Sequence, residues 1–144
     1  MAKKNVKVSL NLIENFKIEA NAGNHKMFVD QPAVAGGSDA GPNPLEYFLA
    51  GLGACLITIG KIAAKQKRIE IRSFSVEVDG LLDLDGLMGK DPSKRAGFEE
   101  IVLNVKLDAD LSDDEKMAFL KEVENRCPVA DNVLRQSKIS FKLA

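Results

Sequence analysis

Residues 43–55 read Asn43-Pro44-Leu45-Glu46-Tyr47-Phe48-Leu49-Ala50-Gly51-Leu52-Gly53-Ala54-Cys55, and they predict the start of a long apolar helix. Asn43 is a favourable N-cap residue, and Pro44 suits the first helical position. Glu46 at the third helical position completes a capping-box pattern. Apolar residues then recur every three or four positions and define one face of the helix: Leu45, Phe48, Leu52, Cys55, Ile59 and Ile62.

The other faces of this helix also carry no charge from Tyr47 to Gly60, so we predict a helix that is buried on all sides. Its glycines, Gly51, Gly53 and Gly60, each lower helix stability by about 0.5–1 kcal/mol relative to alanine. We therefore expect them to allow the close approach of another backbone. In a chain of 144 residues that backbone would belong to a partner subunit.

Apolar–polar alternation predicts short strands on both sides of the helix. In chain order the expected strands are residues 6–10, 16–20, 25–29, 69–80, 101–107 and 139–143. The alternation slips at Arg72-Ser73, which indicates a β-bulge. A capping box from Ser112 to Glu115 predicts a second helix, and Pro128 opens a short third one through Leu134. The expected class is α+β in a single domain, residues 1–144.

Composition excludes several classes of function. The net charge is −1, so no basic surface for nucleic acid is expected, and with no tryptophan and one tyrosine a base-stacking platform is absent. The longest uncharged run has 14 residues, against the roughly 20 that a membrane-spanning helix needs. We expect a cytoplasmic protein that does not bind membranes. Two cysteines and one histidine without ligand spacing predict neither a metal nor another cofactor.

The two cysteines, Cys55 and Cys127, are the strongest candidates for chemistry, because in the cytoplasm a lone pair is more often reduced or catalytic than a structural disulfide. Rigid elements could hold them as a peroxidatic and resolving pair. Buried cysteines also serve as plain packing residues, and that reading stays open on composition alone. Cys127 directly precedes Pro128 and is expected to be the N-cap of the short helix, where a thiolate is stabilised.

Cys55 needs help to ionise, because burial in mid-helix disfavours a thiolate. The candidate cations are Arg126, His25 and Lys26, and Arg126 ranks first because it adjoins Cys127. Glu46 lies nine positions before Cys55, which on a straight helix is the opposite side and about 13 Å away. We expect Glu46 to cap its own helix, or to orient a cation at a neighbouring subunit's site.

The segment from Gly41 to Cys55 resembles the first cysteine motif of the OsmC/Ohr family, and Arg126-Cys127-Pro128-Val129 is similar to the second. The resemblance covers nearly the whole chain and is closer to the Pro-Leu-Glu subgroup. It implies an OsmC-like fold with antiparallel sheets around a buried central helix. It also implies an intertwined homodimer with active sites at the subunit boundary. Family members with an assigned activity reduce organic hydroperoxides with external dithiols, often lipoyl groups.

Two departures from the family pattern stand out. Leu45 occupies the position after Pro44 where enzymatic members carry a glutamate, and here Glu46 comes one residue later. No arginine precedes Arg68, although enzymatic members carry one in the N-terminal hairpin.

The leading functional prediction is thiol-dependent reduction of organic hydroperoxides through a sulfenic acid at Cys55 and a disulfide with Cys127. Cys55, Cys127, Glu46 and Arg126 are the predicted site residues. The alternative is a non-catalytic protein that binds a small apolar ligand at the dimer interface. Acyl transfer through Cys55 ranks last, because His25 alone would have to act as the base.

Overall fold

The computed structural model describes residues 2–144, which fall into two compact units that meet between Phe48 and Leu49. Strands dominate the first unit, whereas the second combines a strand pair with helices, so the expected α+β class is confirmed. The expectation of a single domain stays a prediction.

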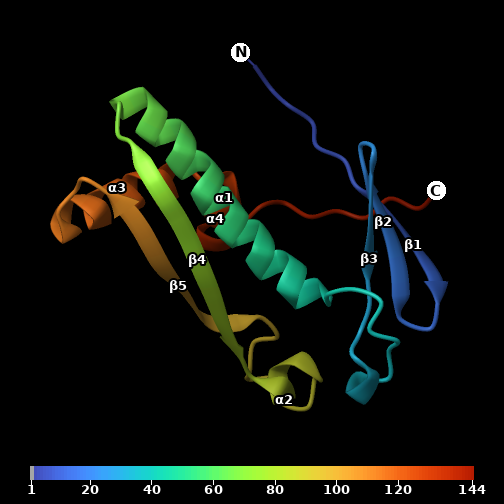
Figure 1. Cartoon of the computed structure of the whole chain (residues 1–144). Helices are drawn as coiled ribbons and strands as arrows, with labels where there is room; N and C mark the ends of the chain where they lie inside the picture. Colours follow the sequence, from blue (N-terminus) through green and yellow to red (C-terminus); the bar gives the residue numbers. More distant parts are fainter. Residues whose placement is uncertain (1) are drawn as a thin grey trace. The chain divides into compact units, whose positions relative to one another are not determined.

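The first unit is a three-stranded antiparallel meander of β1 (Ser9–Glu14), β2 (Lys17–Ala22) and β3 (His25–Val29), drawn in blue in Figure 1. The predicted second and third strands are confirmed. The first strand begins at Ser9, later than expected, and Val6 and Val8 are exposed. Cross-strand pairing puts one apolar set on the same face: Leu10, Leu12, Ile18, Ala20, Met27 and Val29.

A carboxylate organises the loop that follows β3. Asp30 is 1% exposed and accepts hydrogen bonds from the backbone N–H groups of Gln31 (2.7 Å), Ser38 (3.2 Å) and Ala40 (3.1 Å). These bonds, with that from Gln31 first, hold the pKa of Asp30 below its ordinary value. The Asp30 N–H in turn donates to the Pro42 carbonyl (3.2 Å), two residues before the next helix begins.

The second unit is built on an antiparallel hairpin of β4 (Ile71–Leu82) and β5 (Phe98–Ala109), with the short α2 (Leu84–Leu87) in its connection. The pairing register shifts between Ile71 and Ser73, which confirms the predicted bulge. Figure 1 shows α1 (Pro44–Lys67) running beside this hairpin.

Two further helices complete the second unit. α3 (Asp113–Arg126) begins with the predicted capping box, in which Ser112 and Glu115 bond to each other's backbone N–H. α4 (Pro128–Leu134) has the predicted bounds. One core joins α1, β5 and α3, and its buried members are Leu56, Ala63, Ala64, Leu107, Ala109, Phe119 and Val123.

The buried stripe of α1 differs from the predicted one. Its members are Leu52, Gly53, Leu56, Gly60, Ala63 and Ala64, whereas Leu45, Phe48 and Ile62 of the predicted stripe are exposed in this chain. Small residues occupy the buried positions because they leave room for the side chains of β4. A Cβ on Gly60 would lie 2.7 Å from the Phe74 ring. The partners of Gly53 and Gly60 are thus β4 side chains, not a second backbone.

The predicted C-terminal strand at residues 139–143 was wrong for the isolated chain. Residues 136–144 form no helix or strand, and Ile139, Phe141 and Leu143 are 82%, 94% and 101% exposed. A strand needs a neighbour to pair its backbone, and the chain described here offers this segment none.

By length and composition alone, α1 could cross a membrane, since its most apolar 18-residue window has a mean hydropathy of 1.7. The core helix of a soluble protein passes the same test. The uncharged run within α1 is 14 residues long, from Tyr47 to Gly60.

Candidate functional site

The structure brings Cys55 and Cys127 together inside the second unit. Cys55 lies midway along α1, and Cys127 lies at the junction of α3 and α4, 72 residues later. Cys127 belongs to a buried cluster against which Cys55 packs, and the two thiols are close enough for Cys127 to act on the pKa of Cys55. Both cysteines are free thiols.

Cys127 is held by the turn that opens α4. It is the N-cap residue, and its Sγ accepts a hydrogen bond from the Ala130 N–H at 3.4 Å. Pro128 occupies the first helical turn, where its missing N–H leaves no partner unsatisfied. Cys127 is only 1% exposed, whereas Cys55 is partly exposed. Cys55 is therefore the more accessible residue of the two in the single chain.

The surroundings of Cys55 act on its charge in opposite directions. Burial raises the pKa of the Cys55 thiol most, and the hydrogen bond and the charge of Cys127 raise this pKa further. The backbone N–H of Val129 donates to the Cys55 sulfur and lowers the pKa. The net direction is upward, so Cys55 holds its proton more tightly than an ordinary thiol.

The candidate cations have other partners in this chain. Arg126, the last residue of α3, donates from Nη1 to Oε1 of Gln66 at 2.9 Å. Gln66 is eleven residues beyond Cys55 on α1, which is about 16 Å along the helix axis. Lys26 forms an ion pair with Glu19 at 2.8 Å, and His25 is exposed at the start of β3.

Glu46 caps its own helix. Its Oε1 accepts from the Asn43 N–H at 3.0 Å, while the Asn43 side chain accepts from the Glu46 N–H at 2.9 Å. This reciprocal pair of hydrogen bonds is the predicted capping box. It holds the Glu46 carboxylate at the first turn of α1. Cys55 lies nine positions after Glu46 on the same continuous helix.

Apolar side chains surround the pair of sulfurs. Those packed with it are Leu52, Ile59, Val78, Ile101, Leu103 and Val129. The predicted N-cap role of Cys127 is confirmed, because its sulfur accepts from the Ala130 N–H. The group that sequence reasoning missed is the Val129 N–H, which acts on the pKa of Cys55. Its signal was present, since the first residues of a helix that begins at Pro128 have N–H groups without an intrahelical partner.

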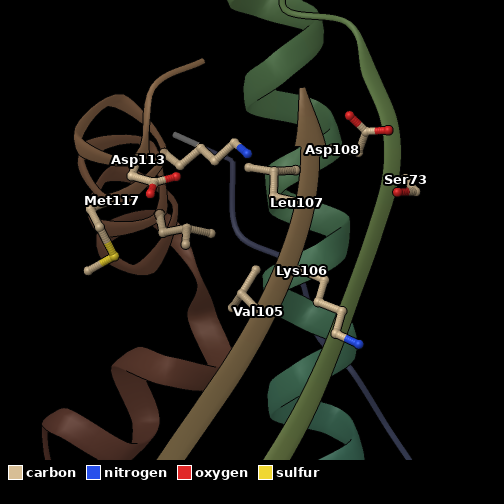
Figure 2. Close-up of a pocket in the computed structure, with 9 residues that line it drawn as sticks. Ser73, Val105, Lys106, Leu107, Asp108, Asp113 and Met117 are labelled. Carbon is tan, nitrogen blue, oxygen red and sulfur yellow. The ribbon is translucent and has the colours of Figure 1, made fainter. Parts of the chain in front are cut away.

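A separate groove of about 630 Å³ lies between β5 and α3. Figure 2 shows Val105 and Leu107 on β5 facing Asp113 and Met117 on α3. Neither cysteine lines this groove, so it is distinct from the thiol pair. Residues 2–144 contain no cluster of three or more side chains that could hold a metal ion.

Comparison with known proteins gives a family match. Residues 36–143 match the family model described as OsmC-like protein. An OsmC-like protein from Mycoplasma pneumoniae superposes with a TM-score of 0.81 at 23% identity, covering 94% of this chain and 91% of its own.

Two similar structures carry a functional name. An organic hydroperoxide resistance protein from Legionella pneumophila has a TM-score of 0.69 at 23% identity, with 94% of this chain and 93% of that chain covered. Another from Elizabethkingia anophelis has a TM-score of 0.69 at 18% identity, with 94% and 91% covered. At these identities the likeness establishes the fold alone. No functionally curated protein matches the sequence.

Proposed function

The chain belongs to the OsmC-like protein family, and we propose that it reduces organic hydroperoxides with Cys55 and Cys127. The observation that carries the proposal is the packing of Cys55 against the buried cluster that holds Cys127, 72 residues later in the sequence. Two structural neighbours named as organic hydroperoxide resistance proteins support the class of substrate.

The proposed cycle is balanced in three steps. The Cys55 thiolate attacks the terminal peroxide oxygen, the O–O bond breaks, and Cys55 becomes a sulfenic acid while an alcohol leaves. Cys127 displaces hydroxide from that sulfenic acid and forms the disulfide, with release of water. An external dithiol, of which a lipoyl group is one example, then reduces the disulfide and is itself oxidised.

The surroundings of the pair favour an apolar peroxide. Leu52 shares the buried cluster of Cys127, and Val78 and Ile101 pack against this cluster. Burying an alkyl group among such side chains contributes roughly 25 cal/mol per Å². A partly exposed Cys55 beside a buried Cys127 also suits the order of events, because the attacking sulfur must meet the peroxide.

We also propose a homodimer. Leu10 and Leu12 on the apolar face of the β1–β3 sheet are 62% and 61% exposed in the single chain. In the second unit Ile139, Phe141 and Leu143 are exposed as well, so each unit leaves apolar side chains for a second copy to cover. Glu46 and Arg126 remain predictions as site residues, because within this chain each has another partner.

Thiol counting after exposure to an alkyl hydroperoxide tests the function. The reduced protein is expected to lose two thiols per chain and release one alcohol, and lipoamide-type dithiols should restore both. Cys55→Ser should abolish alcohol release, whereas Cys127→Ser should release one equivalent and stop at a sulfenic acid. If the wild-type protein kept both thiols under excess peroxide, the enzyme proposal would be lost.

The raised pKa of Cys55 favours a second candidate, in which the protein binds a small apolar ligand without chemistry. A thiol that stays protonated behaves as a packing residue. Ligand binding with unchanged affinity by Cys55→Ser, together with peroxide-resistant wild-type thiols, would support this function over the first.

A further inference from the structure

We propose that Gln66 is a positioning residue for the disulfide step. Its hydrogen bond to Arg126 holds the end of α3 against α1, and this docking sets where Cys127 lies relative to Cys55. The inference rests on the proposed function and deepens it. It gives Arg126 a positional role in place of the electrostatic one expected from the sequence.

The two cysteines lie on different helices, so the relation between them depends on how α3 docks on α1. Cys55 is midway along α1, whereas Cys127 directly follows the last residue of α3. A disulfide needs its two Cα atoms within about 7 Å and a narrow range of dihedral angles. A misplacement of about 1 Å can slow a reaction about 100-fold. The docking of α3 on α1 therefore bears on the rate at which the disulfide closes.

Small residues on α1 and larger ones on α3 form the apolar part of this docking. Ala63 and Ala64 are 0% and 3% exposed, and they share one buried core with Phe119 and Val123 of α3. The hydrophobic effect is non-directional, so it holds the two helices together more strongly than it fixes the position of α3 along α1. Directional contacts have to supply that position.

Two polar contacts supply it at the end of α1. Arg126 donates from Nη1 to Oε1 of Gln66 at 2.9 Å. One turn earlier on α3, Glu122 forms an ion pair with Lys67 at 2.9 Å. Glu122 and Arg126 are four residues apart and therefore lie on one face of α3, while their partners are the last two residues of α1. Of the two contacts, the Gln66–Arg126 bond is the nearer to the thiol, because Arg126 adjoins Cys127.

The junction after Arg126 passes this position on to the sulfur. Cys127 is both the C-cap of α3 and the N-cap of α4, and its N–H donates to the Glu124 carbonyl at 3.1 Å. Its Sγ accepts from the Ala130 N–H at 3.4 Å, and the residue is 1% exposed. Backbone and side chain of Cys127 are thus both held, so a shift of the α3 end moves the sulfur with it.

Competition between closure and trapping measures the step. Reduced protein is treated with an alkyl hydroperoxide and a fixed concentration of a 1,3-dione, which captures the Cys55 sulfenic acid before Cys127 closes on it. From the usual strength of exposed polar contacts, Gln66→Ala should slow closure by about two- to fivefold and raise the captured fraction. The burst of alcohol should keep its wild-type rate, because Cys127 enters only at the second step. Unchanged closure in Gln66→Ala would refute the inference, although the peroxidase proposal would survive.

Matched variants separate positioning from a general loss of stability. Gln66→Glu keeps an acceptor for the guanidinium and should close at least as fast as wild type. Lys65→Ala, at an exposed neighbouring position, should close at the wild-type rate. Ser112→Ala weakens α3 at its opposite end and should leave closure unchanged. If Ser112→Ala slowed closure as much as Gln66→Ala, or if Gln66→Glu failed to restore it, the inference would be overturned.

A double-mutant cycle tests whether Gln66 acts through Arg126. Arg126→Ala removes the same hydrogen bond from the other side, so its effect on closure should equal that of Gln66→Ala. The double variant should be no slower than either single variant. Additive effects would show that the two residues act separately and would contradict the proposal.

Diamide closes the same disulfide without a peroxide. It takes up two electrons and two protons, first as an adduct on one thiol and then as a hydrazine displaced by the second thiol. Slower closure in Gln66→Ala than in wild type supports the positioning role even if alkyl hydroperoxides release no alcohol, in which case the peroxidase proposal alone fails. Equal closure rates with diamide would overturn the positioning role.

Discussion

Gly60 on α1 packs tightly against the Phe74 ring on β4, so Gly60→Ala measures how closely the helix bearing Cys55 fits the hairpin. An added Cβ would lie 2.7 Å from Cε2 and 3.4 Å from Cζ of Phe74. Ordinary carbon–carbon contacts begin near 3.5 Å, so the ring must move by several tenths of an ångström. Overpacking of this kind typically costs about 1–3 kcal/mol, and the better helix propensity of alanine returns about 1 kcal/mol.

The expected net loss for Gly60→Ala is about 0–2 kcal/mol in the free energy of unfolding, measured by urea denaturation. Gly51→Ala is the control, because a Cβ there meets nothing within 4 Å in this chain and should stabilise the helix by about 0.5–1 kcal/mol. Phe74→Leu should relieve the clash, so a double-mutant cycle should give a coupling of about 1 kcal/mol or more. No coupling between the two substitutions would refute the packing argument.

Three further predictions follow from the contacts described. The pKa of Asp30 is lowered in the folded chain, so its stabilising effect is present above about pH 4. That effect is lost as pH falls through the folded pKa, and Asp30→Asn should flatten the acid limb of a stability–pH curve; an unchanged limb contradicts this. Ser112→Ala should lower the free energy of unfolding by about 1 kcal/mol through loss of the α3 cap, and a thermal melt that does not move would argue against the capping box. Arg126→Ala should leave the pH midpoint of Cys55 alkylation where it is, whereas an upward shift would show that the guanidinium reaches the thiol.

Local signals predicted most of the fold. Turn residues and alternation were enough for β2, β3 and the β4–β5 hairpin, including the bulge near Arg72. The capping residues Asn43 and Ser112 fixed two helix starts, because their side chains act on N–H groups only three positions away. Such interactions depend on adjacent residues and can be read directly from the sequence.

Long-range choices were less predictable. The buried face of α1 contains Gly53 and Gly60, because the side chains of β4 leave room only for small residues there. The spacing of the large apolar residues alone does not predict this face. The segment from Ile139 to Leu143 alternates like a strand, yet pairing depends on a neighbouring backbone that no local pattern encodes.

The candidate site shows the same division. Cys55 was predicted to lie near Cys127, and in the second unit it packs against the buried cluster that holds Cys127. Their redox pairing stays a prediction. The N-cap bond from the Ala130 N–H to Cys127 was predicted from Pro128, whereas the Val129 N–H was missed because it acts on Cys55, a residue of another helix. Arg126 was predicted as the cation because it adjoins Cys127 in the sequence. Arg126 is the last residue of α3, whereas Cys127 is the N-cap of α4, so their side chains point in different directions. The Arg126 guanidinium donates to Gln66 instead.

The hydrogen bonds from the loop backbone to the Asp30 carboxylate determine which loop positions can change during evolution. Since main-chain N–H groups supply all three bonds to that carboxylate, the intervening side chains contribute little to the shape of the loop. Positions 33–35 should therefore drift freely among descendants, whereas Asp30 should resist replacement. Gly37 should resist it as well, because any Cβ there would strike the Gln31 carbonyl oxygen. The sequence of the loop before α1 could therefore diverge among homologues while the first turn of α1 stays in place.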